Sequence, residues 1–91
     1  MSEPLAPGAE GRILVIDDEP SLRDVLQIGL TRAGFEVGTA SSHSEAMALL
    51  GEPWDLILTD LQLPDGDGLS ILRHAKEIAP ETAVVVLTAH G

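Results

Sequence analysis

The chain contains no cysteine and almost no aromatic side chain, and each absence narrows what it can be. Without cysteine it has no disulfide bond, no thiolate-ligated metal and no thiol nucleophile. Phe35 and Trp54 are its two aromatic residues, so a core built from its 44% hydrophobic residues must be aliphatic. No unbroken apolar run exceeds five residues, whereas a membrane-spanning helix needs about 20. These absences favour a small domain with an aliphatic core.

Cationic side chains are also scarce. Five Lys and Arg residues oppose fifteen Asp and Glu residues, which gives a formal net charge of −10. This balance argues against direct binding to nucleic acid or to an anionic membrane surface. Residues 1–11 are rich in Pro and Gly and have neither the basic start nor the apolar stretch of a secretory signal. We therefore expect a flexible leader over residues 1–11 and one cytoplasmic domain over residues 12–91.

Short apolar runs recur along the chain at the spacing of buried strands. Residues 13–16 (ILVI) form a continuous β-branched run that stops at acidic residues, as a strand buried on both faces does. Residues 35–39 alternate between apolar and polar, which is typical of an edge strand. Residues 56–58 (LIL) predict a third strand. Residues 83–87 (AVVVL) predict a fourth strand, the most buried of the four by composition.

Helical patterns separate these runs. The first begins near Pro20, which the first helical turn tolerates, and ends at Gly34. The second begins at a capping box formed by Ser42 and Glu45 and ends before Gly51. Asp67 or a neighbour is expected to cap the third helix. The predicted inner face of that third helix comprises Leu69, Ile71, Leu72, Ala75 and Ile78.

Strands that alternate with helices predict right-handed βαβ units in a three-layer, doubly wound parallel α/β sheet. The pattern runs β-α-β-α-β-α-β, and no helix follows the last strand. An uncovered apolar strand is a site for pairing with another chain. We therefore expect a domain that is truncated at its C-terminus, with an exposed fourth strand.

Acidic residues follow the predicted strands at the edge where such sheets bind ligands. Asp17 and Asp18 follow the first strand, Asp60 follows the third, and Thr88 follows the fourth. Two carboxylates about 4 Å apart repel by roughly 4 kcal/mol at an effective dielectric constant of 20. If these strands are neighbours, the three aspartates and the Thr88 hydroxyl converge on one small site. A cluster of this kind needs a proton or a hard divalent cation, and Mg²⁺ prefers oxygen ligands. A carboxylate beside a cation can also accept a phosphoryl group.

Three motifs in this order make the chain resemble the receiver domain of two-component response regulators, the CheY-like superfamily. They are residues 16–20 (IDDEP), Asp60 with residues 63–68 (LPDGDG), and residues 88–91 (TAHG). The resemblance implies a flavodoxin-like fold with strand order 2-1-3-4. The last motif is most similar to the NtrC class of sigma-54-dependent transcriptional regulators.

The resemblance also implies a role for each matching residue. Asp60 would accept a phosphoryl group from a sensor histidine kinase. Asp18 and Asp60 would ligate Mg²⁺ directly, with Asp17 close by or acting through water and the Gln62 backbone carbonyl as a further ligand. Thr88 would be the switch hydroxyl. The domain would signal to an effector that regulates transcription, and its own activity would be limited to self-phosphorylation and autodephosphorylation.

Two departures keep a second function open. The family's fifth strand, last helices and fifth-strand lysine have no counterpart, and the one lysine, Lys76, lies late in the third helix, where we expect it to be solvated. The alternative is a phosphorylation-impaired receiver fragment that forms a homodimer or exchanges strands through its fourth strand. An EF-hand is excluded because Leu69 occupies a ligand position. An aspartate-nucleophile phosphatase is disfavoured because Asp17-Asp18 lacks the Asp-x-Asp spacing.

Overall fold

The computed structural model describes residues 10–87. Residues 1–9 of the predicted leader and Thr88 lie outside the described residues. The elements follow the chain in this order: β1 (Arg12–Ile16), α1 (Pro20–Arg32), β2 (Glu36–Ala40), α2 (His43–Leu49), β3 (Leu56–Asp60), β4 (Gln62–Leu63), β5 (Gly66–Asp67), α3 (Gly68–Ile78) and β6 (Ala83–Leu87).

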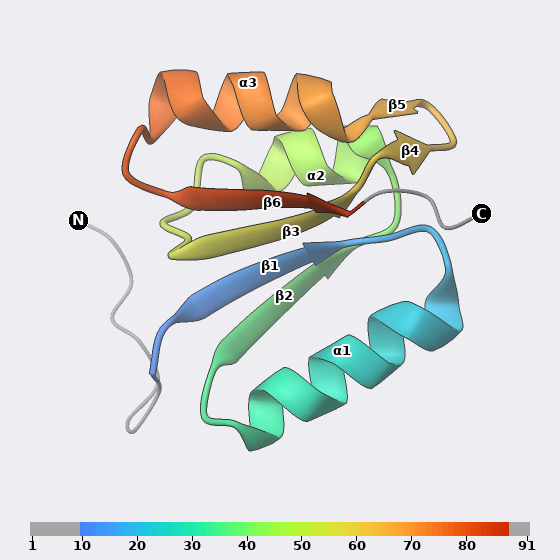
Figure 1. The fold of residues 1–91 in the computed structure, drawn as a ribbon, viewed down its shortest axis with the longest axis vertical. Coiled ribbons are helices and arrows are strands. Elements are labelled where there is room, and N and C mark those ends of the chain that lie inside the picture. Colours follow the sequence, from blue (N-terminus) through green and yellow to red (C-terminus); the bar gives the residue numbers. More distant parts are fainter. Residues whose placement is uncertain (1–9, 88–91) are drawn as a thin grey trace.

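The main sheet is parallel, with the order β2-β1-β3-β6. Since β6 is the fourth of the predicted strands, this order confirms the predicted flavodoxin-like topology. Helix α1 lies on one side of the sheet and α2 with α3 on the other, which gives three layers (Figure 1). The antiparallel pair β4–β5 occupies a segment that the sequence pattern leaves as a loop. No helix within residues 10–87 has the length and apolar character that crossing a membrane requires.

Strand β1 lies at the centre of the fold, and its side chains alternate between the two faces of the sheet. Leu14 belongs to the main core cluster with Ile57 of β3 and Ile71 of α3. The neighbouring Ile13 and Val15 are also buried and point to the opposite face, the one covered by α1. Burial on both faces explains why this strand reads as a continuous apolar run, as the sequence predicts.

Helix α1 begins at a cap that the sequence pattern does not assign. The carboxylate of Glu19 caps α1 by accepting a 3.0 Å hydrogen bond from the Ser21 N–H. The cap therefore leaves Asp17 and Asp18 for another role. At the other end of α1, Gly34 has a φ of +103°, a backbone conformation that favours glycine.

The other two helices begin as the sequence predicts. Ser42 caps α2 by accepting a 3.1 Å hydrogen bond from the Glu45 N–H. The Glu45 carboxylate reaches back one residue further than in a standard capping box, to the Ser41 N–H at 2.7 Å. Asp67 caps α3 by accepting a 2.8 Å hydrogen bond from the Ser70 N–H.

Two burial predictions are wrong. Strand β6 is not the most buried strand: Val85 is 44% exposed, because β6 pairs only with β3 among the described residues and lies at the edge of the sheet. The inner face of α3 is narrower than predicted, since Leu69 and Ile78 are 47% and 49% exposed. Because α3 lies over β3 and the edge strand β6, only a central stripe of the helix contacts the sheet, and Ile71 and Ala75 fill it.

Candidate metal and phosphoacceptor site

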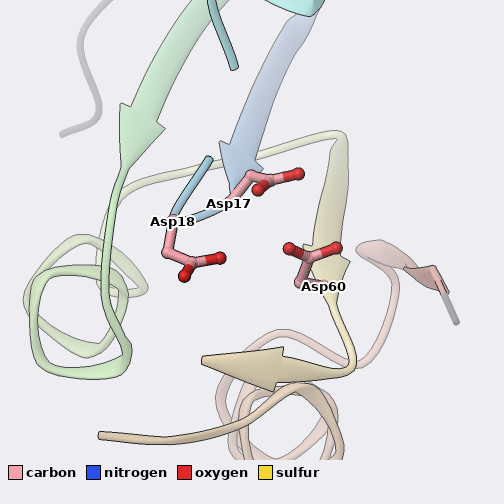
Figure 2. A group of neighbouring side chains, drawn as sticks. All are labelled: Asp17, Asp18 and Asp60. Carbon is pink, nitrogen blue, oxygen red and sulfur yellow. The ribbon is translucent and has the colours of Figure 1, made fainter. Parts of the chain in front are cut away.

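Three carboxylates converge at the carboxyl edge of the sheet. Strands β1 and β3 are parallel neighbours in which Ile16 pairs with Thr59, so the residues that follow these two positions lie side by side. One oxygen from each of Asp17, Asp18 and Asp60 lies within 4.8 Å of the others. Figure 2 shows the three side chains around a common space. The arrangement depends on the strand order, because β1 and β3 are about 40 residues apart along the chain.

Asp17 is the buried member of the group, with 2% of its surface exposed. Its Oδ1 accepts a 2.8 Å hydrogen bond from the Glu19 N–H, whereas its Oδ2 is buried without a hydrogen-bond partner. A buried carboxylate oxygen without a partner is costly, and such groups are normally paired or bound to a metal. The open oxygen of Asp17 is therefore the local observation that fits a bound cation.

The donor set indicates which cation the site suits. All three groups offer carboxylate oxygens, which hard cations such as Mg²⁺ and Ca²⁺ prefer over nitrogen or sulfur. Two unit charges separated by 4–5 Å repel by roughly 3–4 kcal/mol at an effective dielectric constant of 20. A divalent ion offsets this repulsion. It would also lower the barrier to the approach of an anionic phosphoryl group.

The start of α3 lies directly against the backbone at the end of β3. The Gly68 N–H donates a 2.8 Å hydrogen bond to the Leu61 carbonyl, and the Thr59 hydroxyl donates one of 3.0 Å to the Asp60 carbonyl. A Cβ atom added at Gly68 would lie less than 3.0 Å from the Asp60 carbonyl oxygen, a separation that real Cβ atoms essentially never show. Glycine at this position therefore lets α3 begin directly against the candidate phosphoacceptor.

Asp65 ties the segment after Asp60 to helix α2, a contact that the sequence pattern does not reveal. Its Oδ1 accepts a 2.7 Å hydrogen bond from the His43 N–H, and its Oδ2 accepts one of 3.0 Å from the Ser44 N–H. These two backbone hydrogen bonds lower the pKa of the Asp65 carboxyl. The His43 ring continues the contact through a 3.1 Å hydrogen bond to the Ser70 hydroxyl. The β4–β5 pair is thus held against the start of α2.

The remaining predicted residues have different outcomes. Gln62 begins β4, two residues after Asp60, and its role as a ligand stays a prediction. Thr88 lies outside the described residues. Lys76 is at the opposite end of the sheet, where its Nζ donates to the carbonyls of Pro80 and Thr82 at 3.2 and 2.5 Å. It is exposed, as expected, but it also ties together the α3–β6 connection, and it is remote from the carboxylates.

Arg23 is a residue near the site that sequence reasoning missed. Its Nη1 donates a 2.7 Å hydrogen bond to the backbone carbonyl of Asp17. The available signal was the position of a basic residue on the first turns of the helix that directly follows the acidic pair. That signal is weak, because basic residues are common on exposed helices.

The fold and the site together define a three-layer α/β domain with an acidic cluster suited to a divalent cation at the carboxyl edge of its sheet. Residues 13–91 match the family model described as the response regulator receiver domain, and the chain belongs to that family.

Known proteins agree with this assignment. The chain is 42% identical to the response regulator protein PilR of Pseudomonas aeruginosa over 81 residues, which cover 88% of the chain and 18% of PilR. It is 38% identical to the DNA-binding transcriptional regulator NtrC of Proteus hauseri over 83 residues, covering 90% of the chain and 18% of NtrC. The chain therefore spans less than a fifth of the length of either regulator. Among solved structures, the response regulator TrrA of Thermotoga maritima in complex with Mg²⁺-BeF aligns with a TM-score of 0.81 and 32% identity, over 89% of this chain and 71% of that one.

Proposed function

We propose that this domain accepts a phosphoryl group on Asp60 from a sensor histidine kinase in a Mg²⁺-dependent reaction. The observation that carries the proposal is the convergence of Asp17, Asp18 and Asp60, with one buried Asp17 oxygen left without a hydrogen-bond partner. The similarity to a regulator that was solved with Mg²⁺-BeF supports it.

The reaction would place a new bond between an Asp60 carboxylate oxygen and the phosphorus atom. The phosphorus–nitrogen bond of a phosphohistidine donor breaks at the same time, and its electron pair stays on the imidazole nitrogen. The product is an acyl phosphate on Asp60. Mg²⁺ would neutralise charge on the phosphoryl oxygens.

The surrounding residues would hold the cation and orient the acceptor. Asp18 and Asp60 would bind Mg²⁺ directly, and the Gln62 carbonyl would add a further ligand. Asp17 would act close by or through water, and its open Oδ2 provides the acceptor for such a contact. Thr88 would hydrogen-bond a phosphoryl oxygen and bias the output surface.

The output would be transcriptional regulation in the cytoplasm through an effector domain of the longer protein. The support is that both compared regulators are several times longer than this chain, and that one is named as a DNA-binding transcriptional regulator. The motif at residues 88–91 favours the NtrC class. The receiver itself would make no contact with DNA, because its net charge of −10 opposes binding to phosphates.

The test is phosphorylation with a small donor, followed by intact-mass measurement. Wild-type protein treated with acetyl phosphate and Mg²⁺ should gain one phosphoryl group, and Asp60→Asn should gain none. Asp24→Asn, an exposed change on α1, should behave like the wild type. An unchanged wild-type mass, or phosphorylation that persists in Asp60→Asn, would overturn the proposal.

A second candidate function is pairing with another copy through β6. It is favoured by the half-exposed apolar side chains of this strand, Val85 above all, and by the lack of a second neighbouring strand among residues 10–87. Sedimentation should then show a dimer that Val85→Glu dissociates. A monomer at all concentrations tested would exclude this function.

A further inference from the structure

The peptide unit between Asp17 and Asp18 sets the direction of two of the three converging carboxylates. The two residues share this planar unit, so its orientation constrains the directions of both Cα–Cβ bonds relative to Asp60. Strand pairing ends one peptide unit earlier. The Asp17 N–H, which belongs to the Ile16–Asp17 unit, donates a 3.0 Å hydrogen bond to the Ala40 carbonyl of β2, at the end of the β1–β2 ladder. The Asp17 carbonyl lies beyond the ladder and needs another partner.

Arg23 provides that partner. Its Nη1 donates a 2.7 Å hydrogen bond to the Asp17 carbonyl oxygen. Arg23 is half-buried, although α1 has no fully buried residue. The contact engages a backbone carbonyl and leaves the buried Oδ2 of Asp17 open.

The contact also lies between elements that meet at the carboxyl edge. Hydrogen bonds from the Ser41 N–H and hydroxyl lower the pKa of Glu45 at the start of α2, and the positive charge of Arg23 lowers it further. Arg23 is thus near β1, α1 and α2 together. The Arg23 guanidinium therefore stabilises the loop after β1 without binding a carboxylate oxygen that a metal ion would need.

We propose that Arg23 is a positioning residue that orients the Asp17–Asp18 peptide and so prepares the acidic site for its divalent cation. This inference rests on the proposed function. A positioning role and a purely electrostatic role predict opposite effects of removing Arg23 on Mg²⁺ affinity. Removing a positive charge near a cation site should by itself tighten Mg²⁺ binding, because like charges repel. Removing a positioning contact should weaken it, and loss of partners that orient metal ligands typically costs 10- to 100-fold in affinity.

The test compares Arg23→Met with Arg23→Lys and with the control Arg32→Met. Methionine keeps an apolar stem but removes the donor and the charge. Lysine keeps the charge and one donor group. Arg32 is exposed in the last turn of the same helix, so its replacement makes the same change in net charge away from the site. Mg²⁺ affinity is measured by calorimetry at constant ionic strength.

We expect Arg23→Met to weaken Mg²⁺ binding by roughly tenfold, Arg23→Lys to recover part of the loss, and Arg32→Met to bind like the wild type. Unchanged or tighter binding by Arg23→Met would overturn the inference. If Arg23→Met does not fold, the Mg²⁺ affinity of Arg23→Lys is compared with that of the wild type. Equal affinities would then count against a positioning role of the Arg23 guanidinium.

A second measurement separates this inference from the proposed function. The Glu19 N–H donates a hydrogen bond to Asp17 Oδ1, and its hydrogen exchange, measured with no metal added, reports the order of the loop. Exchange at Glu19 should be faster in Arg23→Met than in the wild type and in Arg32→Met. If the wild type fails to bind Mg²⁺, the metal site is refuted while faster exchange still supports the positioning role. Unchanged exchange overturns that role whatever the metal result.

Discussion

Replacing Gly68 with alanine tests whether the close approach of α3 positions the candidate phosphoacceptor. Gly68 is the first residue of α3 and lies against the Asp60 backbone. An added Cβ would come inside 3.0 Å of the Asp60 carbonyl oxygen. It would also lie 3.2 Å from both the Asp60 carbonyl carbon and the Thr59 methyl group. Two of these three contacts are with backbone atoms, which cannot rotate away, so α3 or the end of β3 must shift.

The expected size of the effect follows from two opposing terms. Alanine restricts the unfolded chain more than glycine, which alone would stabilise the fold by roughly 0.4–1 kcal/mol. Overpacking a well-filled site costs about 1–3 kcal/mol. The balance is a loss of about 1–2 kcal/mol in the free energy of unfolding. For a domain of this size that lowers the melting temperature by roughly 4–16 °C.

The assay is thermal unfolding followed by circular dichroism, together with phosphorylation by acetyl phosphate. Gly29→Ala is the matched control, because a Cβ at this exposed position on α1 meets nothing within 4 Å. It should raise stability by roughly 0.5–1 kcal/mol and leave phosphorylation unchanged. Gly68→Ala should lower both stability and phosphorylation. The reasoning is refuted if Gly68→Ala is as stable as Gly29→Ala and accepts phosphate at the wild-type rate.

Two further predictions concern the Asp65 carboxylate and the hydrophobic core. The pKa of Asp65 is lowered by hydrogen bonds from two backbone N–H groups, so its carboxylate stabilises the fold above the unfolded pKa, and this contribution is lost as the pH falls through the lower folded pKa. Asp65→Asn should therefore reduce the pH dependence of the melting temperature below about pH 4. If the melting temperature of this variant falls with pH as steeply as that of the wild type, the prediction is contradicted. Ile71→Ala should lower the free energy of unfolding, measured with urea, by about 2–5 kcal/mol, because Ile71 is fully buried. Leu69→Ala should lower it far less, because Leu69 is half-exposed. Equal losses in the two variants would show that the core is assigned wrongly.

Local patterns carry most of the fold. The apolar run 13–16 must be covered on both faces, and the polar residues after it must end the strand. Ser42 and Asp67 cap their helices because a side-chain oxygen next to a helix start meets unpaired N–H groups wherever the rest of the chain lies. Features of this kind depend on neighbours a few residues away, so periodicity and residue type are enough to predict them.

Burial at the edges of the sheet depends on distant elements. A β-branched run such as Ala83–Leu87 is compatible with a central strand and with an edge strand. Its place beside β3 leaves Val85 exposed within the described structure. The apolar face of α3 likewise extends past the strands that it covers. The prediction that Ile78 lies on the inner face is wrong for this reason.

The sequence by itself determined that acidic residues lie where the first and third apolar runs end, because the end of an apolar run is a local property. Only the tertiary structure decided that Asp17 and Asp60 meet, that Arg23 holds the Asp17 carbonyl, and that Gly68 lies against the Asp60 backbone. The physical reason is that these contacts join groups through the order of the strands and the placement of α1 and α3. No short-range pattern of residue types encodes those distances.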